Sequence, residues 1–193
     1  MKKVLIQTII ILLFFVIHNA KANIKSITEG NVDAKVKLIV FESLTCSHCA
    51  DFHKKIYPKI KKDFIDAGLV KIEFRHFPLD IAALNAAKIA QCAFSKNLEV
   101  LESLYFNQNV WVKGKTVDEL NENLKNFVRN EGFDINFDEC IKNKKIEDFV
   151  LNDRIDGTKN FKVNATPTII INNKKFEKTL NYKNLKKTLE KLI

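Results

Sequence analysis

The chain has 193 residues and carries 32 Lys and Arg against 23 Asp and Glu, so its formal net charge is +9 at pH 7. Such a basic chain could bind nucleic acid, but its bases are almost all lysines interleaved with acidic and apolar residues at helical spacing, which favours a solvated surface and no nucleic-acid partner. Its four cysteines are too sparse to replace a hydrophobic core, which excludes a small disulfide-held scaffold.

The N-terminus has the pattern of a secretory signal peptide. Two lysines precede an apolar run over residues 4–17, and the sequence HNAKAN that follows has Ala20 and Ala22 at the small-residue positions of a cleavage site. We therefore expect residues 1–22 to be removed, which lowers the charge to about +6 and exports all four cysteines to an oxidising compartment. A retained membrane anchor is the alternative, although the apolar run of 14 residues is shorter than the roughly 18 that a spanning helix needs.

The first half of the exported chain alternates strand, helix and strand. Residues 36–41, VKLIVF, form the short apolar run expected of a buried central strand, and residues 70–77, VKIEFRHF, alternate apolar and polar side chains as a half-buried strand does. Between them, apolar residues recur every three or four positions and predict a helix: Phe52, Ile56, Ile60 and Phe64. Pro58 should kink this helix. The three elements predict a right-handed crossover unit.

The second half first becomes helical and then returns to strands. Residues 80–160 carry helical periodicity without a proline, which is too much helix for a simple connection. Residues 165–171, ATPTIII, then predict a strand, residues 172–173, both asparagine, a hairpin turn, and residues 181–193 a closing helix.

This order of elements predicts an α/β fold in two parts. Residues 23–78 and 161–193 should form a core domain around one sheet. Residues 79–160 should form a helical domain inserted into that core.

The stretch TCSHCADFH directly follows the first strand and holds two cysteines and two histidines: Cys46, Cys49, His48 and His53. A c-type haem site needs a histidine directly after the second cysteine, where this chain has Ala50. Tetrahedral zinc usually takes a second pair of ligands, and the remaining candidates are scattered along the chain: His76, Cys92 and Cys140. The cluster therefore predicts a redox-active cysteine pair, with no metal and no cofactor.

The positions of the two cysteines predict different roles. Cys46 comes between the end of the strand and the first turn of the helix, where unpaired N–H groups and the helix dipole stabilise a thiolate. Cys49, one turn later on the apolar face, should be the shielded thiol that closes the disulfide. His48, when protonated, would stabilise the Cys46 thiolate further, although an exposed histidine without effect is the alternative. Since a stabilised thiolate makes the disulfide easier to reduce, the pair should donate disulfides.

Four motifs, TCSHCADFH, FRHFPLD, AAKIAQCA and ATPT, together resemble the DsbA family of thiol:disulfide oxidoreductases and are similar to its alpha-proteobacterial branch. The resemblance covers essentially the whole exported chain and implies a thioredoxin fold with an inserted helical domain. It also implies that Thr166 and Pro167 form a cis-proline loop beside the cysteine pair, where an extended substrate segment would bind. An ordinary trans proline at the start of the strand is the alternative.

The resemblance further implies a periplasmic enzyme that passes the Cys46–Cys49 disulfide to exported polypeptides through a mixed disulfide at Cys46. Its expected partners are unfolded exported polypeptides with free cysteines and a membrane quinone reductase of the DsbB type as reoxidant, and it is expected to be a monomer. A disulfide isomerase or reductase is the alternative enzyme, although isomerases of this superfamily usually add an N-terminal dimerisation domain. A metal-binding chaperone with Cys46, Cys49 and His48 as ligands is the alternative from another class.

One position departs from the family pattern. A buried acid often stands six positions before the first cysteine, and this chain has Val40 there. Glu42 has the same strand parity and could move the proton of Cys49, but we favour a surface carboxylate at the end of the strand. His53, one turn beyond Cys49, is expected to face solvent, and His76 to be a surface or packed histidine.

The remaining cysteines, Cys92 and Cys140, lie in the helical region. In an oxidising compartment they should form a structural disulfide, and some proteins similar to this chain carry a second disulfide in the helical domain. A pair of inert buried thiols is the alternative. In the loop-entropy model, a bridge across so long a loop stabilises the fold by about 4 kcal/mol.

Overall fold

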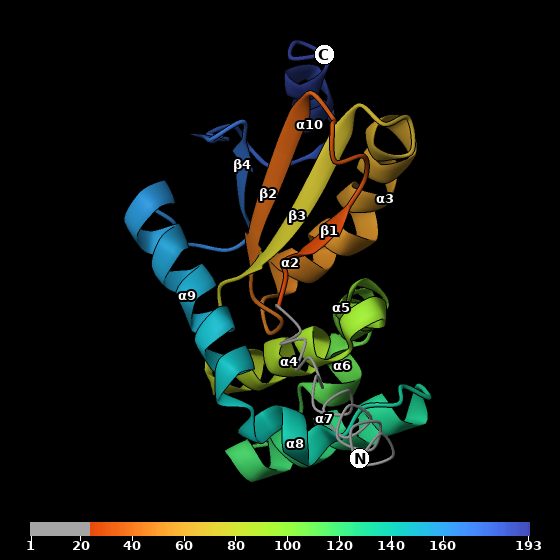
Figure 1. Cartoon of the computed structure of the whole chain (residues 1–193), viewed down its shortest axis with the longest axis vertical. Coiled ribbons are helices and arrows are strands. Elements are labelled where there is room, and N and C mark those ends of the chain that lie inside the picture. The colour runs from red at the N-terminus through yellow and green to blue at the C-terminus, as the bar shows by residue number, and fades with distance from the viewer. Residues whose placement is uncertain (1–23) are drawn as a thin grey trace, which may run out of the picture.

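The structure, a computed structural model, describes residues 24–193, so the expected signal peptide over residues 1–22 lies outside the described residues. Figure 1 shows a twisted sheet in one half of the molecule and a group of helices in the other, with α9 (Lys144–Phe161) running alongside both. Within the described range, no helix combines the length and the apolar character that a membrane span requires.

Five strands form one mixed sheet in the order β1-β3-β2-β4-β5: β1 (Ile27–Glu29), β2 (Val36–Glu42), β3 (Val70–His76), β4 (Thr168–Ile171) and β5 (Lys174–Lys175). β2 and β3 run parallel, as the predicted crossover unit requires, and the other neighbouring strands are antiparallel. Val36, Leu38 and Val40 on one face of β2 are fully buried. The run VKLIVF is therefore the buried centre of the sheet that its composition predicts.

One helical segment connects β2 to β3 and covers one face of the sheet: α2 (Ser47–Asp51), η1 (Phe52–Ile56), α3 (Tyr57–Ile60) and η2 (Lys61–Ile65). Phe52, Ile60 and Phe64 are buried, as the apolar periodicity predicts. η1 and η2 are π-helical turns on either side of Pro58. Because proline lacks an N–H and its ring crowds the carbonyl four residues earlier, a wider turn before it relieves the clash. The break expected at Pro58 therefore takes the form of a π-helical turn.

The chain between β3 and β4 is mainly helical: α4 (Ile81–Cys92), η3 (Phe94–Lys96), α5 (Asn97–Phe106), α6 (Gln108–Trp111), α7 (Val117–Asn130), α8 (Phe137–Lys142) and α9. α4 is rich in alanine, and its small side chains let α5, α7, α8 and α9 pack closely around it. Tyr105 and Trp111 are fully buried within this region. The helical insertion expected from the sequence is therefore present.

The two faces of the sheet are covered by different helices. On one face, α9 approaches β2 so closely that a Cβ on Gly157 would lie 2.8 Å from Cε1 of Phe41, which explains the glycine at this position. On the other face, α10 (Tyr182–Leu189) packs against α3 and buries Leu185 and Leu189. The sheet is thereby enclosed on both faces.

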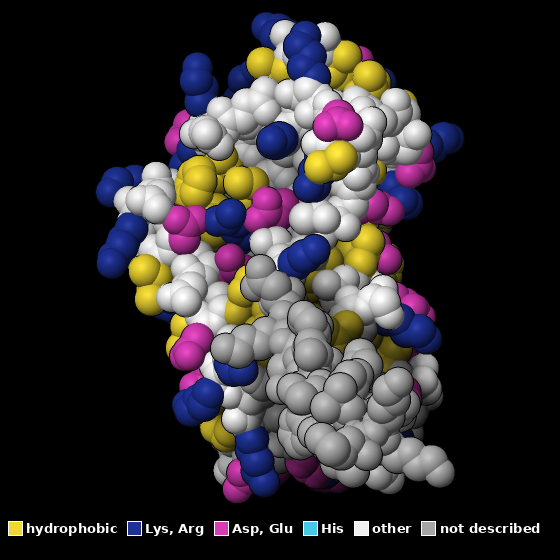
Figure 2. Space-filling model, in the orientation of Figure 1, with side chains coloured by type: hydrophobic (Ala, Val, Ile, Leu, Met, Phe, Trp, Pro, Cys, Tyr) yellow, Lys and Arg dark blue, Asp and Glu magenta, His cyan; other side chains and the backbone are white. Residues whose placement is uncertain are grey.

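Lysines are spread over the surface. Figure 2 shows Lys and Arg side chains interspersed with Asp and Glu over one face of the molecule. Some form exposed pairs, such as Lys125 with Asp138, whose charged atoms lie 2.8 Å apart. Exposed pairs of this kind contribute little to stability. The face shown in Figure 2 carries charges of both signs, as a solvated surface does.

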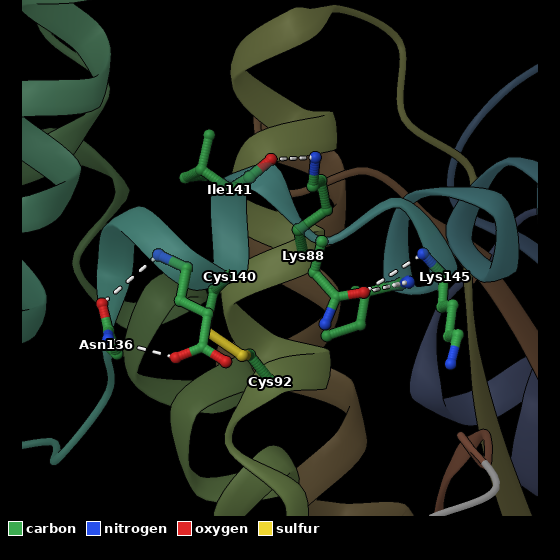
Figure 3. Close-up of a disulfide and its surroundings, with 9 residues drawn as sticks. Lys88, Cys92, Asn136, Cys140, Ile141 and Lys145 are labelled. Carbon is green, nitrogen blue, oxygen red and sulfur yellow. Dashed lines mark hydrogen bonds between the residues drawn. A yellow bond between two sulfur atoms is a disulfide. The ribbon is translucent and has the colours of Figure 1, made fainter. Parts of the chain in front are cut away.

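A disulfide ties the helical region together. Cys92 at the end of α4 and Cys140 in α8 are bonded; their Cα atoms lie 5.9 Å apart, and the two residues are 48 positions apart in sequence. One turn before Cys92, the buried ammonium of Lys88 donates to the carbonyl of Ile141 (Figure 3). It also lies 2.7 Å from Glu147 of α9, whose pKa is lowered to about 2 by Lys144 and Lys88 together. Covalent and ionic contacts thus join α4, α8 and α9.

Replacing both Cys92 and Cys140 with alanine should lower the free energy of unfolding by about 4 kcal/mol, because the unfolded chain gains the freedom of an open loop. Urea denaturation of the oxidised proteins measures the difference. In excess dithiothreitol, which opens the bridge in the unsubstituted protein as well, the difference should shrink. Equal stability of the two oxidised proteins would contradict this prediction.

Candidate active site

Cys46 lies at the junction of β2 and α2. It is the N-cap residue of α2, with an extended backbone at φ −81° and ψ 119°. Its N–H donates to the carbonyl of Ser43 over 3.0 Å, and its half-exposed thiol donates to the carbonyl of Thr166 over 3.4 Å. The sulfur therefore lies beside the first N–H groups of a helix, as expected from the sequence.

These surroundings lower the pKa of the Cys46 thiol to about 5. The largest cause is hydrogen bonding by the neighbouring thiol of Cys49, to which the side chain of Thr166 and the backbone N–H groups of Cys49 and His48 add. Partial burial acts in the opposite direction and is outweighed. At neutral pH, reduced Cys46 is therefore a thiolate.

Cys49 has the opposite environment. It is fully buried, and this burial raises the pKa of its thiol above the ordinary value. The hydrogen bond to Cys46 and the charge of Glu42 act in the same direction. Two cysteines separated by two residues thus differ in protonation state at neutral pH, one a thiolate and the other a thiol.

A groove opens beside the cysteine pair. The Thr166–Pro167 peptide bond in its lining is cis, as the resemblance implies, and the exposed His48 also lines the groove. The groove has a volume of about 570 Å³, and its apolar lining includes Phe52, Ile56 and Leu180. Within residues 24–193, no three His, Cys, Asp or Glu side chains are grouped so that they could hold a metal ion.

Glu42 and His53 correct two expectations from the sequence. Glu42 is 2% exposed and His53 is fully buried, so neither faces solvent. Nε2 of His53 lies 2.9 Å from Oε2 of Glu42. The ring of Tyr105 stacks on the imidazole of His53, with 4.1 Å between the two ring centroids. Burial raises the pKa of Glu42, and His53 opposes that rise. The other carboxylate oxygen, Oε1, has no hydrogen-bond partner among the described residues.

The position of His53 could have been found from its spacing. It follows Cys49 by four residues and therefore shares the buried side of the helical segment. Its partner Tyr105 comes from α5, in the inserted region, and no local pattern indicates that contact. His76 is also packed, which is one of the two expected outcomes. It is 2% exposed, and its Nε2 lies 3.2 Å from Nε2 of Gln91.

Gln108 is a further residue that the sequence analysis did not identify. From the first position of α6, its Nε2 donates to the carbonyl of Leu44 over 2.7 Å and to the carbonyl of Cys46 over 3.1 Å. The contacts join residues 62 and 64 positions apart, and no sequence motif predicts them.

Comparison with known proteins agrees with this geometry. The family model described as Thioredoxin matches residues 22–191. Disulfide bond formation protein D of Bacillus subtilis (strain 168) is 30% identical over 172 residues, which cover 84% of this chain and 74% of that protein. A relative from Rickettsia bellii (strain RML369-C) is 26% identical over 147 residues, and the match spans 55% of its length.

Solved structures show the same fold. Wolbachia pipientis alpha-DsbA1 superposes with a TM-score of 0.78 at 27% identity, covering 87% of this chain and 90% of that chain. Oxidised BdbD from Bacillus subtilis superposes with a TM-score of 0.71 at 26% identity, covering 86% and 92% respectively. The sheet with its inserted helices is therefore a thioredoxin fold, as the resemblance implies. On these matches the chain belongs to the DsbA family of thiol:disulfide oxidoreductases.

Proposed function

We propose that the protein is a periplasmic oxidase that donates the Cys46–Cys49 disulfide to exported polypeptides. The observation that carries this proposal is the opposite shift of the two thiols: the pKa of Cys46 is lowered to about 5, whereas the pKa of buried Cys49 is raised. A sulfur with a low pKa is a good leaving group in thiol–disulfide exchange. Release from Cys46 therefore favours a product in which the substrate keeps the disulfide.

The transfer takes two steps. A substrate thiolate attacks the exposed sulfur of Cys46, forms a mixed disulfide and expels the sulfur of Cys49, which takes up a proton. A second substrate thiolate then attacks the first substrate sulfur, and the thiolate of Cys46 leaves. The substrate loses two electrons to the cysteine pair, and a membrane quinone reductase of the DsbB type would remove them to restore the Cys46–Cys49 disulfide.

Glu42 is the group that we assign to the proton of Cys49. Both are buried on the same side of β2, and the charge of Glu42 is among the causes that raise the pKa of Cys49. His53 holds Oε2 of the carboxyl, while Oε1 has no partner among the described residues and is open to exchange a proton. Glu42 would thus do the work of the acid that this family often carries at the position of Val40.

The substrate would bind along the groove beside the cis-proline. The carbonyl of Thr166 already faces the sulfur of Cys46, and an extended peptide can pair with the backbone at this point. Phe52, Ile56 and Leu180 in the groove offer apolar contact to the residues that flank the substrate cysteine. When His48 at the rim is protonated, its positive charge would stabilise the nearby thiolate of Cys46.

Cellular location and partners follow from the same proposal. The expected signal peptide over residues 1–22 would deliver the enzyme to the periplasm, where unfolded exported polypeptides with free cysteines are its substrates. The Cys92–Cys140 disulfide is typical of an oxidising compartment. The enzyme would act as a monomer.

The test of this function is the redox equilibrium of the cysteine pair in glutathione buffers. A potential near the roughly −120 mV of the strong oxidant DsbA is expected, and a potential near the roughly −270 mV of thioredoxin would reverse the assignment from oxidase to reductase. Cys46→Ser should abolish oxidation of a reduced peptide substrate. Cys49→Ser, given a disulfide-bonded peptide instead, should accumulate the mixed disulfide, because the Cys46 thiolate attacks the peptide disulfide and no second enzyme thiol resolves the product. The Cys92→Ala/Cys140→Ala variant serves as a control and should retain activity.

The reduced protein should show a thiolate titration, followed by ultraviolet absorbance, with its midpoint at about pH 5. The midpoint should rise in Cys49→Ala, because the thiol of Cys49 is the largest cause of the shift. Since the folded pKa lies below the ordinary value of 9.0, the thiolate stabilises the reduced protein fully above about pH 9, and this contribution is lost as the pH falls through about 5. A midpoint close to 9 would contradict the proposed role of Cys46.

Glu42→Gln should slow the reaction of the oxidised pair with a dithiol by about 100-fold, because the amide cannot transfer a proton yet can keep the bond to His53. Stopped-flow measurement across a range of pH is the assay, and the part of the profile due to the carboxyl should disappear in the variant. Asp51→Asn, which removes an exposed acid from α2, is the matched control. If both variants react at the rate of the unsubstituted enzyme, Glu42 does not transfer the proton of Cys49.

A further inference from the structure

The inserted helical region reaches back to the loop that carries the nucleophile. The side-chain amide of Gln108 bridges two carbonyls of that loop, Leu44 at 2.7 Å and Cys46 at 3.1 Å. In Figure 1, α6 lies on the side of α2 that is away from the sheet, among the helices of the insertion. One side chain therefore connects the helical region directly to the peptide unit of Cys46.

The first turn of α2 depends on the carbonyl oxygen of Cys46. It accepts the N–H groups of Cys49 at 3.1 Å and Ala50 at 3.2 Å, and these bonds form the first turn of α2. α2 spans only five residues, and no side chain caps its N-terminus. The direction of its first N–H groups, which face the sulfur of Cys46, therefore depends on how this carbonyl is held.

Gln108 is itself held firmly. It begins α6, which ends at the fully buried Trp111, and the indole N–H of Trp111 donates to the carbonyl of Leu104 over 2.9 Å. The neighbouring Asn107 donates to the carbonyl of Ser103 over 2.9 Å and makes no bond to the loop of Cys46. The buried Trp111 thus fixes the position of α6, and with it the backbone of Gln108.

A second contact between the loop of Cys46 and the helical region involves Thr45 and holds different atoms from those that Gln108 holds. Thr45 donates to Asp80 over 2.7 Å, and Asp80 caps α4 by accepting the N–H of Ala83 over 2.7 Å. This contact fixes the side chain of Thr45 and does not involve the carbonyl of Cys46. The amide of Gln108 holds the carbonyls on either side of Thr45, including the one from which α2 begins.

We propose that Gln108 is a positioning residue that holds the Cys46 peptide unit in the orientation in which the first N–H groups of α2 face the Cys46 sulfur. The inference rests on the proposed role of Cys46 as the nucleophile. Gln108 touches no reacting atom, and it acts through the backbone of Cys46. Its loss should therefore weaken the stabilisation of the thiolate while the fold persists.

The test compares Gln108→Met, which keeps the length of the side chain and removes the donor, with Asn107→Leu, which removes an amide from the adjacent position. The thiolate titration of Gln108→Met should shift upward by about 0.5 to 1 pH unit, the value of one lost hydrogen bond. Hydrogen exchange at the amides of Cys49 and Ala50 should accelerate in the same variant. Asn107→Leu should show neither change, and Gln108→Asn, too short to reach both carbonyls, should give part of the shift.

An unchanged titration in Gln108→Met, or an equal shift in Asn107→Leu, would overturn the inference. Urea denaturation of each variant separates a local effect on the thiolate from a general loss of stability. The titration of the unsubstituted protein separates failure of the proposed function from failure of the inference. If its own midpoint lies near pH 9, both the proposed function and the inference fail, whereas a low midpoint that Gln108→Met leaves unchanged refutes the role of Gln108 alone.

Discussion

The stabilisation of a negative charge on the sulfur of Cys46 is the interaction on which the rest of the site depends. The sulfur is partly withdrawn from water, which opposes ionisation, and the charge is stabilised chiefly by the thiol of Cys49, with help from Thr166 and the first N–H groups of α2. These groups come from separate parts of the chain, so their positions relative to the sulfur depend on the whole fold. The pairing of β2 with β4 brings the cis-proline loop to Cys46, and the buried side of α2 carries Cys49.

The two cysteines share one helical turn but differ in what lies around them. Cys46 stands at the open end of α2 beside a groove, whereas Cys49 points into a core that also contains Glu42 and His53. Burial of ionisable groups costs free energy unless they have partners, and the bond between Glu42 and His53 offsets part of that cost. A core that could have been entirely apolar thus contains an ionisable pair near the buried thiol of Cys49.

Much of the architecture could be predicted because it depends on local patterns. The apolar run of β2, the alternation in β3 and the position of the cysteine pair after a strand indicated the crossover unit, and two cysteines in the helical region indicated a bridge. The expectations for Glu42 and His53 were wrong. The spacing of four residues from Cys49 already indicated the buried side of the helix for His53, but the stacking of Tyr105 on His53 comes from the insertion and could not be predicted. Gln108 escaped notice for the same reason: its contacts are long-range, and glutamine at a helix start carries no signature.

The insertion also has a consequence for the order in which the protein folds. β2, the central strand, pairs with β3 nearby in sequence, but its other neighbour is β4, with Leu38 opposite Ile171. During synthesis from the N-terminus, β2 must therefore remain an open sheet edge until the whole helical region has emerged. Open edges invite pairing with other chains, and contacts between distant residues form slowly. Until β4 pairs with β2, Cys46 lacks its contact with Thr166 in the cis-proline loop, so the completion of the sheet is also the step that assembles the proposed active site.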